Sequence, residues 1–202
     1  MSLASRLYFV RHGQSASNLE GVLSHRVVDL SLTELGREQA RATARWFLGR
    51  PVARVYTSPL RRARETAMEI SLTTGCDVVE LDGLREVDVG ELDGRSDRTA
   101  WELYNRTVSA WREGTGRARF PGGESLDEAL LRICALLDEV LPRHPDDEVV
   151  LVGHGEIFGS VLSRLLHRHS LGGMAPASIT AVRRDEARLT CESWASTDHL
   201  AG

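Results

Sequence analysis

Two short apolar segments, one near each end of the chain, run directly into a histidine that is followed by glycine. Residues 7–13 read LYFVRHG and residues 149–155 read VVLVGHG. Such runs of β-branched and aromatic residues, closed by glycine, predict strands buried inside a sheet. In an open α/β sheet, ligands bind just beyond the carboxyl ends of parallel strands. If the two strands are neighbours, Arg11, His12 and His154 meet in one crevice, where cations and an imidazole nucleophile suit a phosphate group.

The rest of the chain alternates between strand-like and helix-like segments. We predict strands at residues 52–56, 78–81 and 148–152, helices at residues 33–47, 59–75, 97–113, 125–141 and 157–167, and a final edge hairpin formed by residues 179–183 and 189–194. This order predicts an α/β fold with three layers (αβα), in which helices flank both faces of a mostly parallel sheet.

Local signals mark several element ends. Residues 13–31 are rich in Ser, Asn, Gly and Asp, which indicates a loop. Thr33 is expected to cap a helix whose apolar side includes Leu35 and Ala40. Pro59 is expected in the first turn of the next helix, because its fixed backbone angle suits that position.

Length and composition bound the class of protein. With 202 residues, 42% of them hydrophobic, the chain is expected to form a single domain, residues 1–202, and to act as a monomer or homodimer. The net charge of −4 favours neither nucleic acid nor an anionic membrane as a partner. No apolar run is long enough to span a bilayer. The three cysteines lack metal-ligand spacing and are expected to be buried thiols of a cytoplasmic protein.

All 25 basic residues are arginine, and the chain contains no lysine. This excludes a P-loop, whose lysine reaches the β- and γ-phosphates. It also excludes Schiff-base chemistry and the pyridoxal phosphate cofactor, which both need a lysine amine. Arginine instead grips phosphate oxygens through two parallel hydrogen bonds and keeps its charge.

Six segments, taken in order, resemble the histidine phosphatase superfamily, whose fold is that of the phosphoglycerate mutases. The segments read RHGQSASN at residues 11–18, DLSLTELG at 29–36, SPLRRARETA at 58–67, LREVDVGELDG at 84–94, PGGES at 121–125 and HG at 154–155. The resemblance covers nearly the whole chain and implies a small helical cap at roughly residues 95–125.

The resemblance agrees with the roles that chemistry assigns to these residues. His12 is expected to be the nucleophile that forms a phosphohistidine. Arg11 and Arg62 would clamp the phosphoryl oxygens, and His154 would donate a further hydrogen bond. Arg61 is the alternative to Arg62, but the family offset places the clamp directly before Ala63.

Glu86 matches the general acid of the family, which protonates the leaving oxygen and later deprotonates the attacking water. Asp88 and Glu91 are close in sequence and remain alternatives. Nothing in the sequence requires a metal or another cofactor, since no H-E-x-x-H motif occurs.

Five further residues are predicted to contact the substrate: Ser15, Asn18, Ser24, Gly155 and Glu156. Ser15 and Asn18 have an alternative role as capping residues of their loop. Ser24 stands near the position where many phosphatases of the family carry glutamine.

Glu156 departs from the glycine or polar amide that its relatives carry after the second His-Gly. A carboxylate in the first turn of a helix gains roughly 0.3–1 kcal/mol from the helix dipole, and we favour this helix-start role. The alternative is that Glu156 accepts hydrogen bonds from hydroxyl or ammonium groups of a polar substrate.

Taken together, the residues indicate a metal-independent phosphomonoesterase that hydrolyses a small phosphorylated metabolite. The segment from Glu86 to Glu124 is short, and a short cover admits water to the phosphohistidine, which favours hydrolysis. A phosphoglycerate mutase is the first alternative. A non-catalytic module that binds phosphorylated ligands is the second, although such a module needs neither nucleophile nor acid.

Overall fold

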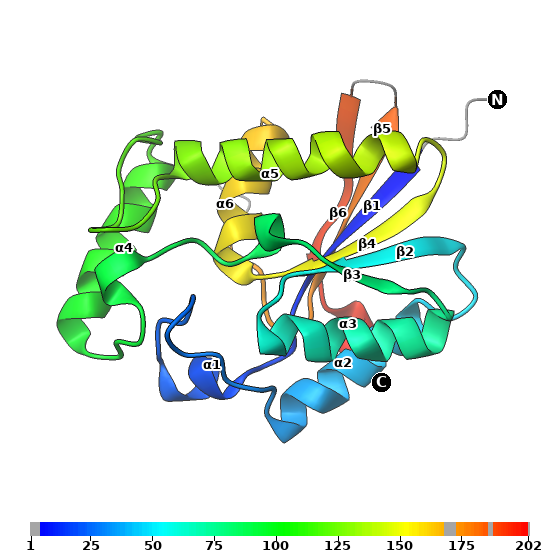
Figure 1. The fold of residues 1–202 in the computed structure, drawn as a ribbon, viewed down its shortest axis with the longest axis horizontal. Coiled ribbons are helices and arrows are strands. Elements are labelled where there is room, and N and C mark those ends of the chain that lie inside the picture. The colour runs from blue at the N-terminus through cyan, green and yellow to red at the C-terminus, as the bar shows by residue number, and fades with distance from the viewer. Residues whose placement is uncertain (1–4, 168–172, 186–187, 202) are drawn as a thin grey trace.

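One six-stranded sheet, in the order β3-β2-β4-β1-β5-β6, forms the centre of the molecule (Figure 1). The computed structural model describes residues 5–167, 173–185 and 188–201. The strands are β1 (Ser5–Arg11), β2 (Val52–Thr57), β3 (Val78–Glu80), β4 (Glu148–Gly153), β5 (Ile179–Asp185) and β6 (Arg188–Ser196). The first four pair in parallel, whereas β5 runs antiparallel to β1 and β6 antiparallel to β5.

Helices cover both faces of this sheet, with α2 and α3 on one side and α5 and α6 on the other (Figure 1). The α-helices are α1 (Ala16–Glu20), α2 (Glu34–Trp46), α3 (Arg61–Thr74), α4 (Arg98–Arg112), α5 (Leu126–Val140) and α6 (Gly155–Leu165). Short 3-10 turns are formed by Asp82–Leu84, Gly90–Leu92, Leu141–Arg143 and Asp198–Leu200. The predicted α/β architecture, with its mostly parallel sheet and its antiparallel edge hairpin, is confirmed.

The alternation of side chains along β1 creates the two hydrophobic layers. Leu7 and Phe9 belong to the buried cluster that includes α5 and α6. Tyr8 and Val10 point to the opposite face and join the cluster formed with α2 and α3. Trp111 of α4 lies in the first of these clusters. Helix α4 therefore packs into the same buried cluster as α5, α6 and one face of the sheet.

The predicted loop at residues 13–31 contains the short helix α1. Ser15 accepts a hydrogen bond from the Asn18 backbone N–H, and the Asn18 side chain accepts one from the Ser15 N–H, which together form a capping box. A five-residue helix of polar composition has no apolar periodicity, so the sequence pattern did not reveal it.

Three further local predictions differ from the structure. Pro59 precedes the N-cap residue Leu60 and lies outside α3, which begins at Arg61. Leu35 is 49% exposed, because it is rotated by about 140° around α2 from the buried Ala40. Helix α6 begins at Gly155, two residues earlier than predicted, for a reason given below.

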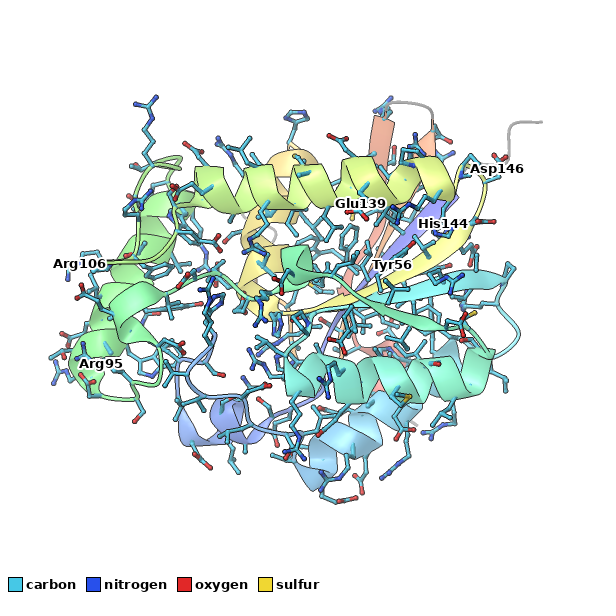
Figure 2. All side chains as sticks on the ribbon, in the orientation of Figure 1. Tyr56, Arg95, Arg106, Glu139, His144 and Asp146 are labelled. Atoms are coloured by element: carbon cyan, nitrogen blue, oxygen red, sulfur yellow. The ribbon has the colours of Figure 1, made fainter. Side chains whose placement is uncertain are left out.

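The labelled side chains of Figure 2 include a polar link within the hydrophobic layer. The hydroxyl of Tyr56 on β2 lies 2.8 Å from His144 Nε2. The other ring nitrogen, His144 Nδ1, lies 2.9 Å from Asp147, just before β4. A buried tyrosine hydroxyl normally needs such a partner, and this one ties two neighbouring strands together.

The three cysteines are free thiols, and each is only partly buried, so the prediction of full burial is wrong. The Cys76 thiol lies at the edge of the core and donates to the Val52 carbonyl oxygen. No helix in the described part of the chain is long and apolar enough to cross a membrane.

Candidate active site

The two histidines that follow the apolar strands lie side by side, as predicted. Strands β1 and β4 pair in parallel with Arg11 opposite Gly153. The His12 backbone N–H continues the ladder by donating to the Gly153 carbonyl oxygen at 3.0 Å. The imidazole rings of His12 and His154 are 5.1 Å apart between centroids, and both are buried.

The hydrogen bonds of His12 define its tautomer. Its Nδ1 lies 2.6 Å from the carbonyl oxygen of Gly13, which can only accept, so Nδ1 carries the proton. Its Nε2 lone pair accepts a hydrogen bond from Arg62 Nε at 3.1 Å. Burial and the positive charges of Arg62 and Arg11 hold the pKa of His12 well below its usual value. The imidazole is therefore neutral at neutral pH, with Nε2 available as a nucleophile.

The backbone after His12 is held from two helices. The N–H of Gly13 donates to Thr66 Oγ1 at 3.1 Å, and the N–H of Gln14 donates to Gln39 Oε1 at 2.8 Å. Gly13 also passes so close to Gly36 that a Cβ on either residue would clash with backbone of the other segment. Thr66 and Gln39 were not among the predicted site residues, although Thr66 stands in the segment at 58–67 and Gln39 lies three residues after the segment at 29–36.

Arg62 lies in the site and Arg61 does not, as the family offset implied. Arg62 is 3% exposed, and its Nη1 and Nη2 donate to the hydroxyl and carbonyl oxygens of Ser24 at 3.1 and 2.9 Å. Arg61 instead forms an exposed ion pair with Glu65 at 2.8 Å. Ser24, predicted as a substrate contact, borders the pocket and orients the Arg62 guanidinium.

Arg11 lies against Gly155 at the start of α6. Its Nη1 donates to the carbonyl oxygen of Met174. A Cβ on Gly155 would come within 3.0 Å of the Arg11 guanidinium carbon, so glycine at this position leaves room for the guanidinium. Burial lowers the pKa of Arg11 and of Arg62, but guanidinium groups stay protonated in proteins.

Two buried nitrogens beside His12 have no hydrogen-bond partner in the described part of the chain: Arg11 Nε and His154 Nδ1. The other ring nitrogen of His154, Nε2, lies 2.8 Å from the hydroxyl of Ser58. Burial and the charge of Arg62 lower the pKa of His154 well below its usual value. Because buried polar groups in proteins are nearly always paired, these two nitrogens indicate a place for an acceptor such as a phosphate oxygen.

Glu86 caps the helix that starts beside His154. Its Oε1 accepts from the Ile157 N–H at 2.7 Å, and its Oε2 accepts from the Glu156 N–H at 3.1 Å. This contact explains why α6 begins at Gly155, since the carboxylate satisfies N–H groups of its first turn.

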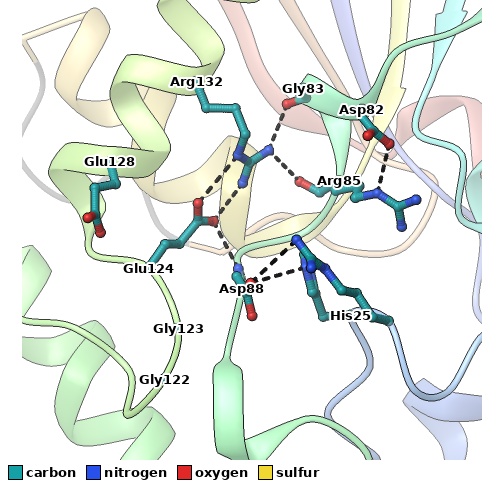
Figure 3. Close-up of a pocket in the computed structure, with 11 residues that line it drawn as sticks. His25, Asp82, Gly83, Arg85, Asp88, Gly122, Gly123, Glu124, Glu128 and Arg132 are labelled. Carbon is teal, nitrogen blue, oxygen red and sulfur yellow. Dashed lines mark hydrogen bonds and ion pairs between the residues drawn. The ribbon is translucent and has the colours of Figure 1, made fainter.

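Of the three candidate acids, Glu86 is the one that lines the same pocket as His12. Asp88 faces a second cavity of about 740 Å³, where its carboxylate lies 3.7 Å from His25 Nε2 (Figure 3). The same carboxylate lies 3.6 Å from Arg26. Glu91 is exposed and borders neither cavity.

Backbone on both sides of Glu86 is held by an ion pair between Glu124 and Arg132, 2.6 Å apart (Figure 3). Glu124 Oε1 accepts from the Asp88 N–H at 2.9 Å. Arg132 Nη1 donates to the carbonyl oxygens of Gly83 and Arg85 at 2.7 and 3.0 Å. Arg132 was not predicted from sequence, because only the fold brings α5 beside this loop.

The pocket around His12 encloses about 190 Å³. Its lining includes Arg11, His12, Ser17, Asn18, Ser24, Arg62, Glu86, Trp101, Tyr104, Gly155, Glu156 and Met174. Eight of the ten predicted site residues therefore line this pocket, and a ninth, His154, lies beside His12. Ser15 is the exception: it is fully buried as the cap of α1, and Ser17 borders the pocket instead. Trp101 and Tyr104 of α4 were missed, because apolar helix positions carry no sign of what they face.

No group of three or more His, Cys, Asp and Glu side chains is placed to bind a metal ion in the described ranges 5–167, 173–185 and 188–201. The positive charge at His12 is supplied by the guanidinium groups of Arg11 and Arg62.

Comparison with known proteins agrees with this geometry. Residues 7–197 match the profile of the histidine phosphatase superfamily (branch 1). A metal-independent phosphoserine phosphatase of Arabidopsis thaliana is 32% identical over 205 residues, which cover 99% of this chain and 85% of that protein. A 2,3-bisphosphoglycerate-dependent phosphoglycerate mutase of Gloeobacter violaceus is 36% identical over 167 residues, covering 80% of this chain and 75% of that protein.

Among solved structures, a mycobacterial glucosyl-3-phosphoglycerate phosphatase superposes with a TM-score of 0.84 at 30% identity, covering 95% of this chain and 99% of the other. The family match spans both histidines, Arg11, Arg62 and Glu86. The chain belongs to branch 1 of the histidine phosphatase superfamily and is a histidine phosphatase.

Proposed function

We propose that this protein is a metal-independent phosphomonoesterase that hydrolyses a small phosphorylated metabolite through a phosphohistidine at His12. The observation that carries the proposal is the surroundings of His12 Nε2. That nitrogen is the unprotonated one of a neutral ring, and its lone pair accepts a hydrogen bond from Arg62 Nε, which an incoming phosphoryl group would displace. The unpartnered Arg11 Nε and the unpartnered His154 Nδ1 belong to the two residues beside it. A nucleophile beside unpaired buried donors is what phosphoryl transfer requires.

In the first step, His12 Nε2 attacks phosphorus and the bond from phosphorus to the ester oxygen breaks. Glu86, as the carboxylic acid, gives its proton to the leaving alkoxide. In the second step, Glu86 takes a proton from water, the water oxygen attacks phosphorus, and the bond to Nε2 breaks. Inorganic phosphate leaves, and His12 and Glu86 return to their starting forms.

The equatorial phosphoryl oxygens would lie against Arg11, Arg62 and His154. Donors that are already in place when charge develops stabilise the transition state, and removing one such donor costs roughly 3–4 kcal/mol. Ser24 contributes indirectly, since its hydroxyl and carbonyl oxygens orient Arg62. Asn18 borders the pocket and supplies a further polar contact for the ligand.

The relatives support hydrolysis of a small metabolite, because the compared phosphatases act on phosphoserine and on glucosyl-3-phosphoglycerate. The mutase alternative rests on the Gloeobacter violaceus relative. Hydrolysis is favoured because the cover from Glu86 to Glu124 is short, so that water reaches a phosphohistidine. With 3-phosphoglycerate, inorganic phosphate as product supports the phosphatase, and 2-phosphoglycerate supports the mutase.

The experiment that tests the proposal is the replacement of His12. We expect His12→Ala to lose at least ~10³-fold in turnover of p-nitrophenyl phosphate while the circular dichroism spectrum is retained. With a phosphate-labelled substrate, the wild-type protein should trap an acid-labile, base-stable phosphoenzyme. His199→Ala is the matched control, since His199 pairs with Thr43 beyond the pocket. Near-normal turnover by His12→Ala would refute the mechanism.

We further propose that the enzyme is cytoplasmic and acts as a monomer or homodimer. The three free thiols support a reducing compartment. Size-exclusion chromatography with light scattering decides the oligomeric state.

A further inference from the structure

The pocket that holds His12 contains a second carboxylate, Glu156, which has no part in the chemistry proposed above. Arg11 and Arg62 are the cationic side chains among the described residues that line this pocket. Both are assigned to the phosphoryl group. Glu156 is therefore not paired with either of them and faces whatever occupies the rest of the pocket.

Two hydroxyl groups hold the Glu156 carboxylate in place. Tyr104 on α4 donates its O–H to Glu156 Oε2 at 3.1 Å. Ser160, one turn further along α6, donates its hydroxyl to Glu156 Oε1. Both donors are neutral, so they orient the carboxylate without cancelling its charge. Burial raises the pKa of Glu156, and the nearby Glu86 acts in the same direction, whereas Arg112 and the hydroxyl hydrogen bonds act against it.

A helix-start role does not account for this arrangement. Glu156 does stand in the first turn of α6, where the helix dipole favours a negative charge. However, the N–H groups of that turn are capped by Glu86, and the Glu156 side chain reaches across to α4 instead. The carboxylate thus borders the ligand pocket together with Tyr104 and Trp101.

The chemistry of the carboxylate determines what it can bind. Two carboxylate oxygens offer about four acceptor positions, and the two hydroxyl groups use two of them. The remaining positions suit O–H or N–H donors on the ligand. A second acidic group on the ligand would instead meet the Glu156 carboxylate, and like charges at close range in an interface repel strongly. The pocket volume of about 190 Å³ suits a ligand with a small alcohol portion.

We propose that Glu156 is a specificity-determining residue that selects phosphomonoesters whose alcohol portion carries hydroxyl or ammonium groups and no carboxylate. This inference rests on the proposed function, because it names the substrate class for the same site. It separates this enzyme from the compared relatives, whose named substrates, phosphoserine and phosphoglycerate derivatives, carry a carboxylate.

Two matched substrate pairs test the inference: in the first pair a carboxylate replaces a hydroxymethyl group, and in the second it replaces a hydrogen atom. The first pair is glycerol 3-phosphate and 3-phosphoglycerate, and the second is phosphoethanolamine and phosphoserine. We expect the wild-type protein to favour the partner without the carboxylate by at least about tenfold in kcat/KM, through the like-charge repulsion at Glu156. Glu156→Gln keeps an acceptor for Tyr104 but removes the charge, and it should reduce both ratios at least about fivefold.

Two variants separate charge from mere structure. Ser160→Ala removes one hydroxyl but leaves the Glu156 charge, so the preference should keep its direction in both pairs. Glu102→Gln removes a carboxylate from the exposed side of α4, where it pairs with Arg98, and should leave both ratios unchanged. Equal losses on all four substrates in Glu156→Gln would mean that Glu156 only joins α4 to α6, and the inference would be overturned.

The kcat/KM ratios of the wild-type protein test the inference even if Glu156→Gln does not fold. A wild-type preference for either carboxylated partner overturns the inference directly. Failure of the proposed function has a different signature, namely no turnover of p-nitrophenyl phosphate by the wild-type protein. In that case the dissociation constants of the four monoesters are measured by calorimetry in place of the rate ratios. We expect tighter binding of the partner without the carboxylate in each pair. Tighter binding of either carboxylated partner would contradict the inference.

Discussion

Glu86 Oε1 accepts a hydrogen bond from the backbone N–H of Ile157 at 2.7 Å, although the two residues lie 71 positions apart in the chain. The proposed acid is thus attached to the first turn of α6, the helix that starts directly after His154. Any shift of this helix moves Glu86 and His154 together. The proposed acid and the residue that donates a hydrogen bond to the phosphoryl group therefore keep their relative positions during the reaction.

The role of Glu86 as acid predicts a dependence on the leaving group. Glu86→Gln should slow the hydrolysis of alkyl phosphates by about 10²–10⁴-fold, because their alkoxides need a proton in the transition state. p-Nitrophenyl phosphate should be affected far less, since its leaving group needs little protonation. Steady-state kcat on both substrates checks this. Equal losses on both would assign the proton to another group.

Loss of the ion pair between Arg132 and Glu124 should produce a weaker form of the same dependence on the leaving group. Arg132→Gln frees the Gly83 and Arg85 carbonyl oxygens and loosens the backbone around Glu86. We expect turnover of alkyl phosphates to fall about tenfold, because small misplacements of a catalytic group are costly, with a smaller loss for p-nitrophenyl phosphate.

Arg143→Gln is the matched control for Arg132→Gln, since Arg143 lies in the 3-10 turn that follows α5 and forms an exposed ion pair with Glu139 of α5. Its kinetics should equal those of the wild type. A loss by Arg132→Gln that is the same for both leaving groups would show a general structural effect rather than a displaced acid.

Gly155→Ala should change stability and catalysis in opposite directions. Alanine is the better helix former and gains up to about 1 kcal/mol at an unstrained helical position. Its Cβ would come within 3.0 Å of the Arg11 guanidinium, which must then move away from the phosphoryl site. We expect kcat/KM to fall about tenfold while the unfolding midpoint in urea is kept or raised. Unchanged kcat/KM would mean that Arg11 does not act through this contact.

The buried histidines predict a loss of stability in mild acid. Burial lowers the pKa of His12 and of His154 in the folded protein, while both groups titrate near 6.5 when unfolded. Below about pH 6.5 the unfolded state therefore binds more protons, so the free energy of unfolding falls as pH decreases. Each histidine contributes up to about 1.4 kcal/mol per pH unit.

Urea unfolding measures the slope of the free energy of unfolding against pH. A range from about pH 7.5 to about pH 5 covers the titration of free histidine. His154→Asn should flatten the dependence, because one of the two depressed groups is gone. A slope that is the same in wild type and variant would show that His154 does not stay neutral in the folded state.

Activity should not depend on a metal ion, because Arg11, Arg62 and His154 supply the donors for the phosphoryl group. We expect turnover of p-nitrophenyl phosphate to be unchanged by excess EDTA and not to rise several-fold on addition of Mg²⁺. Loss of turnover in EDTA that is restored by a divalent cation would contradict the proposed mechanism.

The sequence by itself determined the sheet, the positions of both histidines and most helix boundaries. These features depend on local patterns: a buried strand is a short apolar run, and a cap such as Thr33 acts on a backbone N–H three residues away. The sequence placed the ends of β1 and β4 at the same edge of the sheet, but it treated their adjacency only as a condition, because strand order is not a local property; the structure supplies the pairing.

Only the tertiary structure decided which polar side chains surround His12 and what they contact. The start of α6 depends on a cap from Glu86, and Ser15 contacts its own helix rather than the pocket. Tyr104 meets Glu156 because α4 folds over α6. These contacts join residues far apart in the chain, and their energies depend on burial and on charges that no local pattern contains.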